Sequence, residues 1–238
     1  IGFNAPDAAA LQRMDLASFT VDWNALRAIN PDVVGWIYVP GTTVNFPIVH
    51  GTDDEHYLKT DFYGQTSWVS FGSIFLSAAN AADFSDANNI VYGHHMNDGS
   101  MFSPFADFGD ADTFNGHRTV YVFTPAVNYQ LTTFSIVHCA ADDPLAQTAF
   151  ASEQERQAYV QDKVDRSVVT VAGLPSAADM KHTFAFSTCD NLASNGRWVL
   201  FAYESGSTAA ASSVVADDSN INPEDVAAVS EAAKETAA

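Results

Sequence analysis

The sequence has little positive charge and little sulfur. It contains 10 Lys and Arg residues against 29 Asp and Glu residues, and its formal net charge is -19. Such a chain repels the phosphates of nucleic acids and of anionic membranes, so neither is expected as a partner. The two cysteines, Cys139 and Cys189, are too few for a disulfide framework, although one bridge between them stays open. The cysteine–histidine spacing of a structural zinc site is absent, and we expect neither a metal nor a cofactor.

Long apolar runs are also missing. No stretch of about 18 apolar residues occurs, so no segment is predicted to span a bilayer. A signal peptide is not visible, and the first residue is Ile1 instead of Met. We therefore expect that a leader or membrane anchor has been removed from this sequence.

What is present is enough apolar sequence for one sizeable domain. The chain has 238 residues, of which 47% are hydrophobic. Period-two patterns and turn residues predict short strands at 33–39, 46–49, 73–76, 90–92, 119–124, 127–139 and 168–171, and a closing hairpin at 182–204. Helices are expected after Asp22, which can cap the segment to Ile29, and from the capping box of Ser152 and Glu155 to about Asp165.

This pattern favours an all-β barrel with helical additions, because long helices do not alternate regularly with the strands. The expected domains are an N-terminal helical segment at 1–30 and the barrel at 31–204. Residues 205–238, rich in Ser and Ala with several acidic residues, are expected to form a disordered linker and a short C-terminal helix.

The closing hairpin places a thiol opposite a guanidinium. A strand with alternating faces ends in Cys189, and Arg197 opens the next strand. A thiol nucleophile also needs a proton carrier, and His94 follows the apolar run that ends in Gly93. Each of these residues alone is more often structural, inert or solvent-exposed than catalytic.

Three blocks together resemble the sortases, which are extracytoplasmic cysteine transpeptidases of Gram-positive bacteria. They read Tyr-Gly-His-His-Met-Asn-Asp-Gly-Ser-Met-Phe at 92–102, Ser-Thr-Cys-Asp at 187–190 and Gly-Arg-Trp-Val-Leu at 196–200. Segments 30–42 and 72–76 and the expected helix at 152–165 are similar to class B members. The resemblance covers residues 20–204 and implies the eight-stranded sortase barrel.

The resemblance also implies an activity and a set of roles. A class B sortase cleaves a C-terminal sorting signal of the Asn-Pro-x-Thr-x type after Thr, through a thioacyl intermediate. Cys189 matches the nucleophile, His94 the general acid and base, and Arg197 the residue that stabilises the oxyanion or holds the substrate backbone. Ser187 matches a position that helps bind substrate or oxyanion, and Thr188 and Leu58 are further candidates for substrate binding. His95 is expected to point away from the site.

The implied partners are surface proteins that carry the signal, and an amine from a peptidoglycan precursor or a pilin. The sequence does not choose between these two acceptors. The implied location is the extracytoplasmic face of the cell membrane, reached through an anchor outside this sequence.

Two other functions stay open at this point. One is a cysteine hydrolase of the papain type, although such enzymes place the thiol early, at a helix N-terminus, with the histidine downstream. The other is a non-catalytic β-barrel binding module in which Cys189 is buried and silent.

Overall fold

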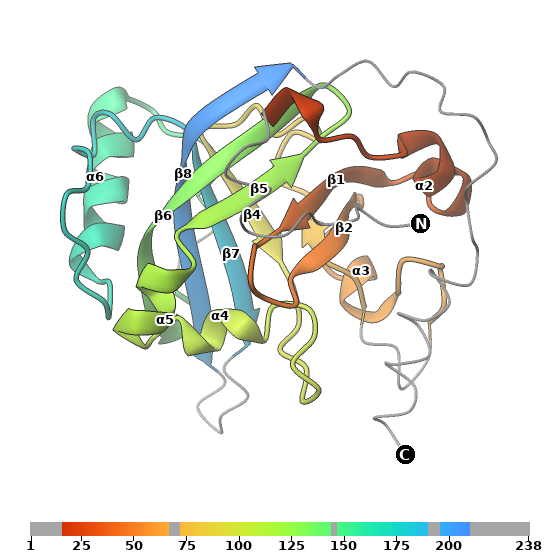
Figure 1. The fold of residues 1–238 in the computed structure, drawn as a ribbon, viewed down its shortest axis with the longest axis horizontal. Coiled ribbons are helices and arrows are strands. Elements are labelled where there is room, and N and C mark those ends of the chain that lie inside the picture. The colour runs from red at the N-terminus through yellow and green to blue at the C-terminus, as the bar shows by residue number, and fades with distance from the viewer. Residues whose placement is uncertain (1–15, 67–71, 144–146, 190–195, 210–238) are drawn as a thin grey trace.

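Eight strands close into a single barrel (Figure 1). The structure is a computed structural model, and it describes residues 16–66, 72–143, 147–189 and 196–209. The order around the barrel is β1-β2-β3-β4-β7-β8-β6-β5. The strands are β1 Val33–Tyr38, β2 Asn45–His50, β3 Phe75–Leu76, β4 Asn88–Tyr92, β5 Thr119–Phe123, β6 Val127–Ala140, β7 Thr183–Cys189 and β8 Gly196–Ala209. The predicted barrel with helical additions is therefore confirmed.

Short helices decorate the barrel. They are the 3-10 turn η1 Leu16–Ser18, α2 Trp23–Ile29, α3 His56–Lys59, α4 Pro104–Asp107, α5 Ala111–Gly116 and α6 Glu153–Asp165. In Figure 1, α6 flanks the barrel beside β6 and β8, and α4 and α5 lie near the end where β7 stops and β8 starts. None of the helices in the described part of the chain is long and apolar enough to cross a bilayer.

The two helix starts predicted from the sequence are confirmed. The Asp22 carboxylate accepts a hydrogen bond from Ala25 N at 2.9 Å, which caps α2. Ser152 Oγ accepts from Glu155 N at 3.1 Å, and the Glu155 carboxylate accepts from Ala151 N at 2.7 Å. The capping box therefore satisfies donors on both sides of the first turn of α6.

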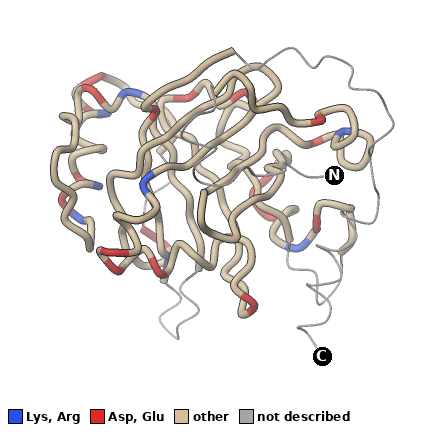
Figure 2. The backbone as a smooth tube through the Cα atoms, in the orientation of Figure 1, with Lys and Arg blue, Asp and Glu red and all other residues tan. Residues whose placement is uncertain are grey.

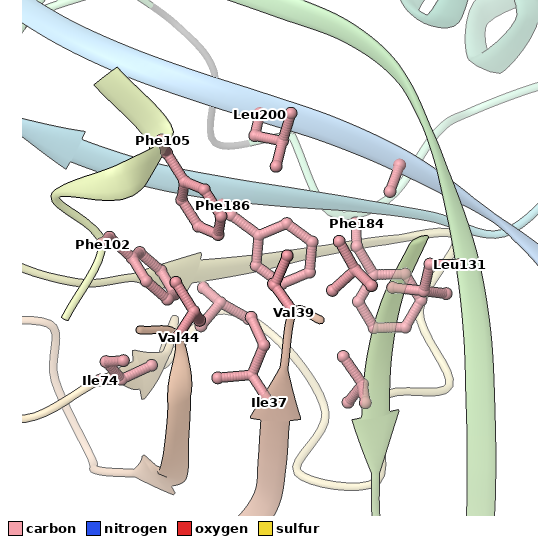
Figure 3. Packing of buried hydrophobic residues seen from close by; sticks show 14 of the residues in the cluster. Ile37, Val39, Val44, Ile74, Phe102, Phe105, Leu131, Phe184, Phe186 and Leu200 are labelled. Carbon is pink, nitrogen blue, oxygen red and sulfur yellow. The ribbon is translucent and has the colours of Figure 1, made fainter. Parts of the chain in front are cut away.

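The barrel interior is filled mainly by phenylalanine and branched aliphatic side chains (Figure 3). Phe102 enters from the segment before α4, Phe105 from α4 itself, and Phe184 and Phe186 from β7. All four are fully buried, and burial of each stabilises the fold by roughly 1.5–3 kcal/mol. The core therefore reaches the barrel end at which β7 stops.

Two smaller clusters attach the outer elements. Tyr159 and Val160 of α6 pack against Val199 and Phe201 of β8. The N-terminal segment places Phe19, Trp23 and Leu26 against the outer faces of β1 and β5. Both clusters bury apolar surface that the barrel would otherwise expose.

Some expectations need correction. Residues 168–171 form no strand: Val168 is 50% exposed, and its N–H donates to Ile136 O, while Val169 turns into the core. The helix α5, capped by Asp110, was not expected. Cys139 is a free cysteine, so the bridge that the sequence left open is not formed.

The C-terminal boundary also differs from the expected position. β8 continues past residue 204 to Ala209 and pairs with β6 as far as Val127. The first five residues of the expected linker therefore belong to the barrel. The rest of that linker and the expected C-terminal helix lie outside the described residues.

Candidate active site

The ends of β7 and β8 bring Cys189 and Arg197 together. They are the last register pair of this antiparallel ladder, and Arg197 also pairs with Cys139 of β6 on its other side. Cα atoms of such partners lie about 4.5–5.5 Å apart. The side chain of Cys189 lies outside the described part of the structure, so its place in the site rests on this backbone register.

His94 comes to the same place along β4. That strand runs parallel to β7, Tyr92 pairs with Ser187, and Gly93 N–H donates to Ser187 O at 3.0 Å. The chain therefore leaves β4 beside the last residues of β7. A Cβ at Gly93 would stand 2.6 Å from the buried Phe102 ring, so only glycine permits this close approach.

The imidazole of His94 is oriented by a backbone carbonyl. Its Nε2 lies 3.0 Å from Leu58 O, on α3. Because a carbonyl oxygen can only accept, Nε2 carries the proton, and Nδ1 is the nitrogen left to exchange a proton. Nδ1 is therefore the ring nitrogen that can accept or donate a proton in a reaction.

Burial and a nearby charge both act on His94. Burial lowers the pKa of His94, the Leu58 carbonyl opposes this, and the positive charge of Arg197 lowers the pKa further. The net shift is downward, which favours the neutral imidazole at neutral pH. A neutral imidazole can accept a proton from a thiol or an amine.

The positive charge of Arg197 affects the pKa values of several groups at this end of the barrel. Its guanidinium is half-buried and donates from one terminal nitrogen to Gly196 O at 2.9 Å. Its charge is felt at His94, at Tyr92 and at Cys139, although burial still raises the pKa of both Tyr92 and Cys139. Arg197 is therefore the cation that acts on both His94 and Tyr92, whereas Arg166 and Lys163 also act on Cys139.

The other candidate residues lie nearby in different environments. Leu58 is 40% exposed, and its carbonyl reaches His94. Ser187 and Thr188 are buried, and within the described residues the Thr188 hydroxyl has no hydrogen-bond partner. Thr188 shares the strand parity of Phe186, which faces the core. His95 forms a β-bridge with Met101.

The sequence did not indicate which residues hold the Leu58 carbonyl in place next to His94. These residues include Tyr57 and Gly72. In the sequence, Tyr57 is typical of a core aromatic residue and Gly72 of a turn glycine. The part of the chain that the structure describes contains no cluster of three His, Cys, Asp or Glu side chains suited to a metal ion.

Comparison with known proteins shows the family of the chain. The chain is 30% identical over 190 residues to the sortase B of Listeria monocytogenes, covering 77% of this chain and 76% of that protein. The chain belongs to the sortase B family. No protein-family model matches it.

Solved sortase B structures share the barrel. The sortase B of Clostridium perfringens has a TM-score of 0.71 and 29% identity, covering 77% of this chain and 99% of that chain. A Staphylococcus aureus sortase B–substrate complex has a TM-score of 0.70 and 27% identity, covering 77% of this chain and 85% of that chain. The thiol-bearing residue ends a strand of this fold, which argues against the papain-type alternative.

Proposed function

We propose that this sortase B family member cleaves a sorting signal of the Asn-Pro-x-Thr-x type after Thr and transfers the protein to an amine. Cys189 is the proposed nucleophile, His94 the proton carrier and Arg197 the donor to the oxyanion. The observation that carries the proposal is the register pair of Cys189 and Arg197 beside a histidine with one ring nitrogen left for chemistry.

In the first half-reaction, the Cys189 sulfur attacks the Thr carbonyl carbon. The carbonyl oxygen becomes negative, and Arg197 can donate hydrogen bonds to it. As the peptide C–N bond breaks, Nδ1 of His94 passes a proton to the leaving amine, and a thioacyl group stays on Cys189. The proton comes from the thiol, so charge balances over the step.

In the second half-reaction, an incoming amine attacks the thioacyl carbon. His94 takes the proton that the amine loses, the C–S bond breaks, and His94 passes that proton to the leaving sulfur, so that the thiol and the neutral imidazole are both restored. A new amide joins the substrate to the acceptor. Water in place of the amine would give hydrolysis.

The proposed partners follow from this reaction. They are surface proteins that carry the signal, and an amine of the cell wall or of a pilin. Acidic side chains outnumber basic ones along the described chain (Figure 2), and this charge favours an amine, which is cationic at neutral pH, over a polyanion. We place the reaction at the extracytoplasmic face of the membrane, in keeping with the resemblance.

A peptide panel tests the proposal. Three peptides are incubated with the protein, with and without triglycine: one with Asn-Pro-x-Thr-x, one with the Thr replaced by Ala, and one with a scrambled order. The products are separated by chromatography and identified by mass spectrometry. We expect cleavage after Thr in the first peptide only, and a triglycine-linked product when triglycine is present. Cleavage that never yields the amine-linked product would point to a hydrolase, and no cleavage of any peptide would favour a binding module.

A further inference from the structure

Tyr57 is the only buried residue of α3, the short helix whose Leu58 carbonyl bonds His94. The helix has four residues; Glu55 makes no side-chain cap hydrogen bond, but the Asp53 carboxylate accepts from Glu55 N at 2.8 Å and from His56 N at 2.7 Å. So short a helix has little stability of its own. Asp53 fixes the start of the helix, and Tyr57 is the side chain that anchors it in the interior of the fold.

The hydroxyl of Tyr57 belongs to a network at the junction of α2 and β1. It donates to Asp32 Oδ2 at 2.7 Å and accepts from Asn30 Nδ2 at 3.3 Å. Asn30 also donates to Phe62 O at 3.1 Å and accepts from Asp32 N at 3.0 Å. Burial and Asp32 raise the pKa of Tyr57 to about 12, so the hydroxyl stays a donor.

The backbone of α3 is held from the opposite side. Ser73 N donates to Tyr57 O at 2.9 Å, and the Tyr57 ring packs with Val49 and Phe75. Gly72 has φ +65, and a Cβ there would stand 2.7 Å from Leu58 O. The segment before β3 can therefore press against these carbonyls only because residue 72 is glycine.

We propose that Tyr57, through its hydrogen bond to Asp32, is a positioning residue that holds the Leu58 carbonyl against His94. It does not touch the reacting atoms. Its effect is to fix the orientation of the imidazole, so that Nε2 stays bonded and Nδ1 faces the chemistry. The effect of this hydrogen bond on catalysis rests on the function proposed above.

The proposal predicts an effect that a purely structural network would not have. Tyr57→Phe keeps the ring and its packing but removes the bond to Asp32, and Asp32 is exposed enough for water to solvate its carboxylate. The Leu58 carbonyl bond raises the pKa of His94, so loosening it lowers that pKa further. Misplacing a catalytic group in this way costs roughly tenfold to a hundredfold in kcat.

The test measures the His94 ring by ¹⁵N NMR over pH, together with kcat and KM on the Asn-Pro-x-Thr-x peptide. The variants are Tyr57→Phe, Asp32→Ala, Asp32→Asn and Gly72→Ala. Tyr121→Phe is the matched control, because it removes a hydroxyl from another buried tyrosine, which packs on Phe19 and Phe123.

We expect Tyr57→Phe, Asp32→Ala and Gly72→Ala to lower the His94 pKa, to mix its two neutral tautomers and to reduce kcat with little change in KM. Asp32→Asn keeps an oxygen acceptor for the tyrosine and should stay close to wild type, as should Tyr121→Phe. The proposal would be overturned by one result. In it, Tyr57→Phe and Asp32→Ala lower the melting temperature but leave the His94 tautomer, the His94 pKa and kcat unchanged. The NMR arm needs no substrate, so a wild-type protein that cleaves nothing would count against the proposed function and leave this test in force.

Discussion

His94 and His182 lie beside opposite ends of β7 and are held in different ways. His182 precedes the first residue of β7; its Nδ1 lies 2.6 Å from Glu204 Oε2, and its Nε2 lies 2.8 Å from Phe84 O. His94 lies beside the last residues of β7, and the described residues give its ring a single partner, Leu58 O. Both nitrogens of His182 are held by groups that fix the fold, whereas His94 keeps one nitrogen that can exchange a proton with a bound group.

The two histidine rings also differ in how they are packed. The His182 ring packs against Tyr129 and Phe184, next to Phe84, which is fully buried at a positive φ of 60. His94 is half-buried and directly follows Gly93, where only glycine lets the backbone pass so close to the Phe102 ring. One end of β7 is therefore closed by packing, and the other carries the proposed active site.

The largest expected effect separates the two thiols on either side of Arg197. Cys189→Ala should abolish peptide cleavage while the fold persists, because no nucleophile is left. Cys139→Ala removes the thiol at the other register partner of Arg197 and should retain most activity. Cleavage rates of both variants, with circular dichroism as the folding control, make the test; full activity in Cys189→Ala would remove that thiol from the mechanism.

The next effect separates the two histidines directly. His94→Ala should lower kcat/KM by roughly 10²–10⁴-fold, the usual value of general acid–base help. His182→Ala should leave kcat/KM near wild type and lower the free energy of unfolding by about 1–3 kcal/mol, because it leaves buried partners unpaired. Peptide kinetics and urea unfolding measure the two quantities, and His95→Ala serves as the neighbouring control. Equal losses of kcat/KM in His94→Ala and His182→Ala would erase the distinction between the two ends.

Arg197 lies at the same end of β7 as His94. A fixed donor aimed at a developing oxyanion is worth about 3 kcal/mol, and a guanidinium offers a planar fork that an ammonium cannot copy. Arg197→Lys should therefore lose nearly as much kcat/KM as Arg197→Ala. The comparison uses one peptide and three proteins. A lysine variant close to wild type would reduce the role of Arg197 to charge alone.

The smallest effect belongs to the closed end and depends on pH. Burial raises the pKa of Glu204, but hydrogen bonds from Ser207 and His182 outweigh it, so the net pKa lies below its ordinary value of 4.5. A depressed carboxyl pKa stabilises the fold above pH 4.5, and this contribution is lost as pH falls through the folded pKa. Urea unfolding should show that the stability advantage of wild type over Glu204→Gln shrinks below about pH 4.5. An advantage that stays constant down to pH 3 would show that Glu204 has no such linkage.

Much of the fold could be predicted because local signals and tertiary demands agree. The long strands β6 and β8 are rich in branched and aromatic residues, and the caps at Asp22 and Ser152 mark their helices. The strand expected at 168–171 failed because its valines are divided between solvent and core in a turn. β-propensity alone does not separate these cases.

The candidate site could be predicted only in part. Side-chain chemistry pointed to Cys189, His94 and Arg197. The acceptor for His94 is a backbone carbonyl, which leaves no mark in the sequence, and it comes from a residue 36 positions away. Tyr57 resembles any core aromatic residue, because its role lies in the position of its hydroxyl.

We place the chemistry at the end of β7, on Cys189. The most direct test of this placement is intact-protein mass spectrometry after brief incubation of wild type with the Asn-Pro-x-Thr-x peptide, followed by proteolytic mapping of the adduct. We expect one acyl group that ends in the Thr of the signal, located on Cys189 and removed by triglycine. An acyl group on Cys139, or an adduct on Cys189 that no amine discharges, would contradict it.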